Sequence, residues 1–220
     1  SLRFTDKIKG NMPTDHQAVL EEILNKAPEE VRKLWTKLQK DFVTVDATSL
    51  DSYYLHGKGV HFNHKIDGSN ENQKRLDGTK ILGKENNTTF YHEYGHHIDG
   101  LLGRTETVER RSKMARKWFT YEVKINRYKS YDIGVTKSLK EEIKETMKHF
   151  EVNSIRDLTI TVRKKVEKEY PFGYSGVSDI LNGLTNGSYS MGWGHEPKYW
   201  KTKDADMLGK EAFAHMFQSY

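Results

Sequence analysis

The segment HEYGHHID, residues 92–99, decides how the chain is interpreted, and it lies in a helical pattern over residues 87–102. In an α-helix residues i and i+4 lie one above the other, so His92 and His96 present two imidazoles on one face. Glu93 projects from an adjoining part of the helix, where its carboxylate can take a proton from water at a metal. The spacing therefore predicts a zinc site with Glu93 as the general base of amide hydrolysis.

The residues around the motif favour this interpretation over an ordinary surface helix that happens to carry two histidines. Phe90, Tyr91, Tyr94 and Ile98 supply a packing face, and no proline interrupts the segment. Gly95 in the middle of a helix costs about 1 kcal/mol relative to alanine. We therefore expect another element to pack closely against this position.

The composition limits the kinds of metal site and partner. The 220 residues include no cysteine, so a metal must be held by histidines and carboxylates. The net charge of +5 comes from 36 basic and 31 acidic residues that are interspersed along the chain. A basic nucleic-acid-binding domain is therefore an alternative, but the sequence contains no motif typical of nucleic-acid recognition. There is no apolar run of about 18 residues, so no membrane partner is expected. Because the chain opens on Ser1, we expect it to be a fragment of a longer protein.

Periodicity predicts helices in the first part of the chain, followed by a small sheet. Helices are expected over residues 14–26, with a capping box of Thr14 and Gln17, and from Pro28 to about Phe42. Alternating residues then predict strands, a polar loop and one more short strand. The strands are expected at 42–45, 53–55, 60–62 and 80–82, with a hairpin turn at 57–59 and the loop at 67–78.

The second half is predicted to be mainly helical. A capping box of Ser138 and Glu141 marks one helix start, and residues 170–203 are rich in Gly, Ser, Asn and aromatics, which predicts a structured functional loop. Helices are expected at 109–124, 138–150, 154–169 and from about Asp206 to the end.

A catalytic zinc usually has three protein ligands, so two histidines leave one to be found. In the last helix Glu211 and His215 share a face at i and i+4, next to an apolar stripe that would dock this helix on the core. HEYGHHID together with KEAFAHMF, residues 210–217, resembles the paired signature of the lethal-factor-like gluzincins, which are zinc metallopeptidases. The resemblance implies that His92, His96 and Glu211 are the ligands and that Glu93 is the base.

Of two further polar residues near the ligands, His215 departs from that family's pattern and Asp99 follows it. His215 stands where the family has a second Glu, and it could support a ligand, alter the site or lie on the helix surface. Asp99 could orient a ligand imidazole, as the resemblance implies, or be a polar residue near a helix end at Gly100 or Gly103.

The residue that stabilises the oxyanion is a second departure from the family's pattern. The family places a tyrosine seven residues before the glutamate ligand, where this chain has Asp204. The nearest substitutes are Tyr199 and His195 in GWGHEPKYW, residues 192–200, and we prefer Tyr199. Four other aromatic residues of this region could line the cleft or simply pack, and no role is assigned to them: Trp193, Trp200, Tyr174 and Tyr189.

A second resemblance covers about the last half of the chain. Three segments carry it: GYSGVSDILNGLTNG (residues 173–187), GWGHEPKYW and KEAFAHMF. Together they are similar to the metallopeptidase-like region of phage minor head or head-morphogenesis proteins. It implies a phage capsid protein as substrate and a location in the virion or host cytoplasm. It also leaves open a non-catalytic structural or zinc-binding module of a phage head.

These observations predict one α+β zincin-like domain over residues 1–220, with an N-terminal lobe of about 1–103 and a helical C-terminal lobe of about 104–220. We expect the cleft between the lobes to bind a peptide or protein substrate, held as an added strand along the sheet edge at 59–63. His97 and the pair His61 and His64 are expected to make ordinary hydrogen bonds and not to bind metal.

Overall fold

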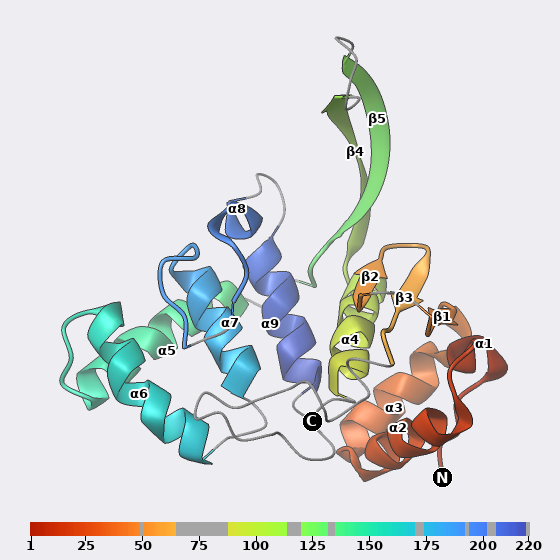
Figure 1. Cartoon of the computed structure of the whole chain (residues 1–220), viewed down its shortest axis with the longest axis horizontal. Helices are drawn as coiled ribbons and strands as arrows, with labels where there is room; N and C mark the ends of the chain where they lie inside the picture. Colours follow the sequence, from red (N-terminus) through yellow and green to blue (C-terminus); the bar gives the residue numbers. More distant parts are fainter. Residues whose placement is uncertain are drawn as a thin grey trace.

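The chain has an α+β structure of mostly helices with a small sheet, as the coarse fold prediction expected (Figure 1). The computed structural model describes residues 1–48, 51–64, 88–113, 120–131, 135–169, 174–191, 194–201 and 206–218. The predicted loop at 67–78 and strand at 80–82, together with Trp193 and Asp204, lie outside these ranges. In the part of the chain that is described, no helix is both long enough and apolar enough to cross a membrane.

The N-terminal part is helical, and its main helix has the predicted bounds. It consists of α1 (Asp6–Lys9), α2 (Thr14–Lys26), α3 (Glu29–Leu38) and the 3₁₀ turn η1 (Gln39–Asp41). The predicted capping box at the start of α2 is wrong, because Thr14 is already helical and Pro13 is the N-cap. Gln17 donates instead to the carbonyl of Met12 at 2.6 Å. Proline fixes φ, which sets the direction of the chain entering the helix.

The sheet contains the predicted hairpin, but its strand order overturns one expectation. Its strands are β1 (Val45–Asp46), β2 (Tyr53–Leu55) and β3 (Gly59–His61), in the order β1-β3-β2. β3 pairs parallel with β1 and antiparallel with β2. The prediction that residues 59–63 form an exposed substrate-binding edge is therefore wrong, because β3 is the central strand.

The helix α4 (Thr88–Leu102), which carries the motif, is anchored on an aromatic core. Trp35 is fully buried, and its ring centre lies 4.6 Å from that of Phe42 and 5.2 Å from that of Tyr94. The hydroxyls of Tyr91 and Tyr94 donate to the carbonyls of Leu20 (2.6 Å) and Val43 (3.1 Å). One face of α4 is thus fixed against the N-terminal part of the chain, which leaves the opposite face to carry the motif histidines.

A long hairpin replaces the helix predicted at 109–124. β4 (Arg104–Lys113) and β5 (Thr120–Lys129) pair antiparallel, and in Figure 1 they project from the body of the molecule. Cross-strand contacts join them, with Glu106 2.6 Å from Arg127 and Glu109 3.7 Å from Lys124. The helix prediction was wrong because the Arg, Lys and Ala residues of this segment favour helices locally, whereas the pairing partners are distant in sequence.

The rest of the second half is helical, largely as predicted. The helices are α5 (Val135–His149), α6 (Ile155–Glu169), α7 (Tyr174–Leu184), α8 (Pro197–Trp200) and α9 (Met207–Gln218). The prediction that a capping box at Ser138 starts this helix is wrong, because α5 begins three residues earlier, at Val135. Much of the predicted loop at 170–203 is the helix α7, in which Gly183 packs so closely on Trp200 that a Cβ would lie 2.7 Å from its ring. Gly183 therefore serves packing, whereas Gly187, with φ of 81°, serves the turn after α7.

The close packing predicted at Gly95 is confirmed, and it brings α4 and α9 together. A Cβ at Gly95 would lie 2.8 Å from the Cα of Ala214 on α9. Only glycine allows the two backbones to approach this closely. In Figure 1 the two helices lie side by side between the N-terminal helices and the group of α5 to α8.

Gly95→Ala is expected to lower the free energy of unfolding by a net amount of up to about 2 kcal/mol. Forcing a methyl group against backbone costs about 1–3 kcal/mol, and the higher helix propensity of alanine returns about 1 kcal/mol. Urea unfolding of the metal-free protein measures the difference. Gly100→Ala is the matched control on the same helix, because its nearest contact is the His56 side chain at 3.1 Å, which can shift. A Gly95→Ala variant more stable than the wild type by about 1 kcal/mol, the propensity gain alone, would contradict the packing argument.

Candidate metal centre

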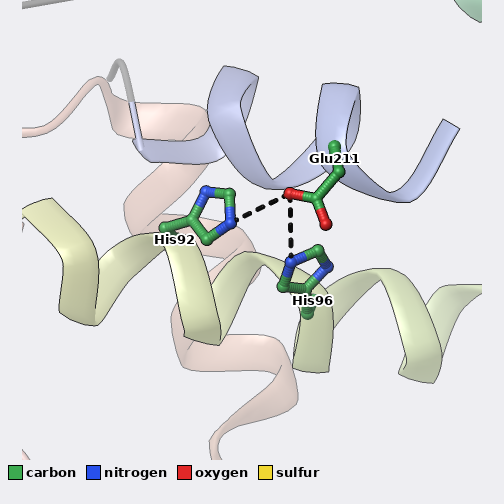
Figure 2. A group of neighbouring side chains, drawn as sticks. All are labelled: His92, His96 and Glu211. Atoms are coloured by element: carbon green, nitrogen blue, oxygen red, sulfur yellow. Dashed lines mark ion pairs between the residues drawn. The ribbon is translucent and has the colours of Figure 1, made fainter. Parts of the chain in front are cut away.

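Two histidines of α4 and one carboxylate of α9 converge on one point (Figure 2). The Nε2 atoms of His92 and His96 lie 3.2 and 3.6 Å from the same oxygen, Oε2 of Glu211. The Glu211 side chain is only 2% exposed, while each histidine side chain is 13% exposed. The structure therefore brings together the three residues that the sequence predicted as metal ligands, and they approach from two helices.

The donor atoms of this group fit a zinc ion. Glu211 Oε2 is buried and has no hydrogen-bond partner among the described residues. Although burial opposes the charged form, the His96 and His92 imidazoles hold the pKa of Glu211 well below its usual range. The neighbours of this oxygen are the two imidazole Nε2 atoms, at 3.2 and 3.6 Å. Two imidazole nitrogens with one carboxylate oxygen are ligands that zinc accepts.

Both residues proposed for the oxyanion lie beside the ligands. Tyr199, on α8, donates its hydroxyl to Oε1 of Glu211. The ring of His195 stacks on that of Tyr199, with centres 4.0 Å apart and planes 12° apart. Burial, assisted by the charge of Glu211, raises the pKa of Tyr199 far above its usual range, so this phenol is a hydrogen-bond donor at neutral pH.

Glu93 lies near enough to His195 and Tyr199 for its charge to affect both residues. Its side chain is buried, with 7% of the residue exposed. Burial lowers the pKa of His195, but Asp179, Glu211 and, more weakly, Glu93 raise it. Burial raises the pKa of Tyr199, and Glu211, Asp179 and Glu93 add to this rise. The carboxylate that the sequence assigned as general base thus acts electrostatically on both candidate oxyanion residues.

Asp179, which was not predicted as a site residue, is a fully buried carboxylate on α7 that contacts His195 and His215. Its Oδ1 lies 2.8 Å from Nδ1 of His195 and accepts the His195 backbone N–H at 3.3 Å. Its Oδ2 lies 3.1 Å from Nε2 of His215. Burial opposes the charged form, yet the hydrogen bond to Asp179 raises the pKa of His195. Helical spacing over 177–184 is the signal that could have found α7 and, with it, this residue.

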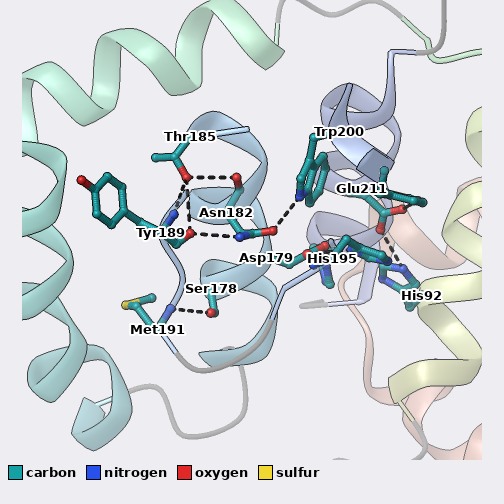
Figure 3. A network of polar contacts seen from close by, with 12 residues as sticks. His92, Ser178, Asp179, Asn182, Thr185, Tyr189, Met191, His195, Trp200 and Glu211 are labelled. Carbon is teal, nitrogen blue, oxygen red and sulfur yellow. Dashed lines mark hydrogen bonds and ion pairs between the residues drawn. The ribbon is translucent and has the colours of Figure 1, made fainter. Parts of the chain in front are cut away.

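Polar contacts along α7 hold the segment that carries His195 and Tyr199 (Figure 3). Asn182 donates to the carbonyl of Tyr189 at 3.1 Å and accepts the indole N–H of Trp200 at 2.6 Å. Ser178 accepts the N–H of Met191 at 2.8 Å. The segment is therefore tied to a helix, as a site that needs fixed geometry requires.

His215 lies behind the ligands and is buried. Its ring centre is 4.3 Å from that of His92, and its two ring nitrogens face Asp179 (3.1 Å) and Gln218 (3.2 Å). Asp179, Glu211 and His215 also come close enough to form a second group with metal-binding donors. Since both Asp179 oxygens already contact histidines, we interpret this second group as hydrogen-bonded support for the first.

Asp99 does not make the contact that the resemblance implied. Its Oδ1 accepts the backbone N–H of Tyr131 at 2.6 Å, and Nδ1 of His96 faces the hydroxyl of Tyr128 at 3.0 Å. Burial raises the pKa of Asp99 to about 6. The carboxylate turns toward the chain that follows β5 and away from the ligand, so it joins α4 to the hairpin.

The remaining histidines of interest make other contacts. His97 is 2% exposed, its Nδ1 lies 3.3 Å from the hydroxyl of Tyr54, and burial lowers its pKa to about 4. His61 lies 3.3 Å from Asp46, and His64 contacts the carbonyl of Ala47. These contacts agree with the expectation of ordinary hydrogen bonds.

Comparison of the chain with protein-family models, with curated proteins and with solved structures found no match. Assignment of a function therefore rests on the motif residues and on the geometry of this centre.

Proposed function

We propose that the chain is a zinc-dependent peptidase with a zincin-like fold. The observation that carries the proposal is the convergence of His92, His96 and Glu211 on one point between α4 and α9. Two histidines and a glutamate are a ligand set of catalytic zinc, in which a fourth position is left for water or substrate. Glu93, next in sequence to one of these ligands, supplies the general base that such a site requires.

Zinc bound by these residues would supply Lewis-acid polarisation of the substrate carbonyl and would lower the pKa of water. Glu93 accepts the proton of the attacking water and passes it to the leaving nitrogen of the cleaved peptide bond. Tyr199 and His195 are the proposed donors to the oxygen that gains negative charge. Nδ1 of His195 donates to Asp179, which raises the pKa of His195 against the effect of burial. In the imidazolium form that this contact favours, Nε2 also carries a proton and would be the donor to the oxyanion.

The burial of the site supports a catalytic use of these groups. Glu93, Glu211 and Asp179 are all below 8% exposed, so their charges act in a medium that weakens them less than water does. The similarity to phage head proteins leads us to propose a capsid or other phage protein as substrate. A zinc-binding module without catalysis differs from the proposed enzyme in one measurable property, peptide cleavage.

Metal analysis and a cleavage assay test the proposal together. The purified chain is expected to hold close to one zinc per molecule and to cleave unfolded protein substrates or a peptide library. A chelator should stop cleavage and added zinc should restore it, whereas the His92→Ala/His96→Ala double variant should bind no zinc. A folded protein that takes up no zinc would contradict the proposal, and zinc uptake without cleavage of any substrate would favour the non-catalytic module.

A further inference from the structure

Tyr128, near the base of the projecting hairpin, makes a direct contact with the metal centre. It is the penultimate residue of β5 and pairs with Thr105 of β4. Its hydroxyl lies 3.0 Å from Nδ1 of His96, and the residue is 6% exposed. The contact joins residues 32 positions apart in the sequence, so no local sequence pattern predicts it.

The roles of the two ring nitrogens of His96 follow from what each faces. Nε2 is directed at Glu211, 3.6 Å away, and is therefore the nitrogen that would bind the ion. A neutral imidazole that binds through Nε2 carries its proton on Nδ1. That N–H donates to the phenol oxygen of Tyr128, which fixes both the tautomer and the plane of the ring.

Contacts from several elements hold the Tyr128 ring. Nζ of Lys210, the residue before the ligand Glu211, lies 4.3 Å from its centre. The rings of His56 and Tyr54 lie 5.3 and 6.1 Å away, and a Cβ on Gly100 of α4 would be 3.4 Å from its Cγ. The tyrosine is thus packed among α4, the β2–β3 hairpin and α9, so its hydroxyl has a defined position.

The other histidine ligand is supported differently. Nδ1 of His92 is buried and has no hydrogen-bond partner among the described residues. Its ring contacts that of His215 instead, at 4.3 Å between centres. Hydrogen-bonded orientation of a ligand imidazole is therefore seen at His96, where the partner comes from the hairpin.

We propose that Tyr128 is a positioning residue of the metal centre, which holds His96 in the tautomer and orientation that bind the ion. The proposal rests on the proposed zinc site. It makes the β4–β5 hairpin part of the metal centre, because the register of β4 with β5 sets where Tyr128 lies. Loss of an outer partner of a ligand histidine typically weakens metal binding by about 10- to 100-fold.

Zinc affinity of the full chain, measured by competition with a chromophoric chelator, tests this role. Tyr128→Phe keeps the ring and removes the hydroxyl, and its Kd for zinc is expected to rise about 10- to 100-fold. The matched control is Tyr54→Phe, since the Tyr54 hydroxyl faces His56 (3.1 Å) and His97 (3.3 Å), neither of which is a proposed ligand. Its zinc affinity should equal that of the wild type. The visible spectrum of the Co²⁺-substituted protein should change in Tyr128→Phe and not in Tyr54→Phe.

A measurement on the wild type keeps the proposal testable if Tyr128→Phe fails to fold. Nitrogen-15 NMR of the histidine side chains in the zinc-loaded protein should show His96 with its proton on Nδ1. A proton on Nε2, or equal zinc affinity of Tyr128→Phe and the wild type, would overturn the role of Tyr128. A wild-type chain that binds no zinc would instead overturn the proposed function, so the two failures are distinguishable.

Discussion

Replacing Glu93 by Gln is expected to lower the rate of peptide hydrolysis by about 10²- to 10⁴-fold, the usual contribution of a general base. The amide has nearly the shape of the carboxylate but does not accept the proton of the attacking water. Zinc content should stay at the wild-type level, because Glu93 is not one of the three residues that converge on the metal position. Measuring kcat and kcat/KM together with zinc by mass spectrometry separates loss of the base from loss of the metal.

A second buried glutamate supplies the control for this substitution. Glu21 is 5% exposed and binds Arg3 and the backbone N–H of Phe4 among the N-terminal helices. Glu21→Gln therefore tests the general effect of neutralising a buried carboxylate, and its hydrolysis rate is expected to remain that of the wild type. Unchanged turnover in Glu93→Gln would remove Glu93 from the role of base.

The parts of the fold that the sequence predicted are those in which local periodicity and burial agree. Helix α4 has an apolar side that packs around Trp35 and a polar side that carries the motif, so its pattern is visible within one segment. The same holds for α2 and α9. The hairpin at 53–61 was also predictable, because a short glycine-containing turn joins its alternating strands.

The β4–β5 hairpin was not predicted, because its stabilising contacts are not local in the sequence. Its stability comes from pairs such as Glu106 with Arg127, which are 21 residues apart, while the intervening residues favour helix locally. Helix α7 was mistaken for a loop because its glycine and serine residues are typical of loops. In both elements tertiary contacts determine the secondary structure, as the close packing of Gly183 against Trp200 illustrates.

The residues of the candidate site were likewise predictable only where a local sequence pattern marks them. The spacing of His92 and His96 is a property of one helix and could be read directly. Glu211 lies more than a hundred residues away, so helical periodicity marked it only as a candidate, and its role as a ligand came from a resemblance of short motifs. Asp179 and Tyr128 belong to the two elements whose structure was mispredicted, so their contacts with the histidines of the centre were invisible in the sequence.

Glu211→Gln is expected to weaken zinc binding by more than the about 100-fold typical of losing an outer partner, because it removes the anionic ligand itself. The isosteric amide keeps the packing of α9 on α4, so a loss of zinc cannot be assigned to separation of the helices.

Glu211→Asp retains the charge but shortens the side chain, and it should bind zinc with an affinity between those of Glu211→Gln and the wild type. Chelator competition gives the three affinities, with Glu21→Gln as the control for neutralising a buried carboxylate. If Glu211→Gln bound zinc as tightly as the wild type, the third ligand would have to be another residue. Since Glu211 Oε2 lies within 3.6 Å of both imidazole Nε2 atoms, a graded loss across this series would instead identify it as the residue that joins α9 to the metal.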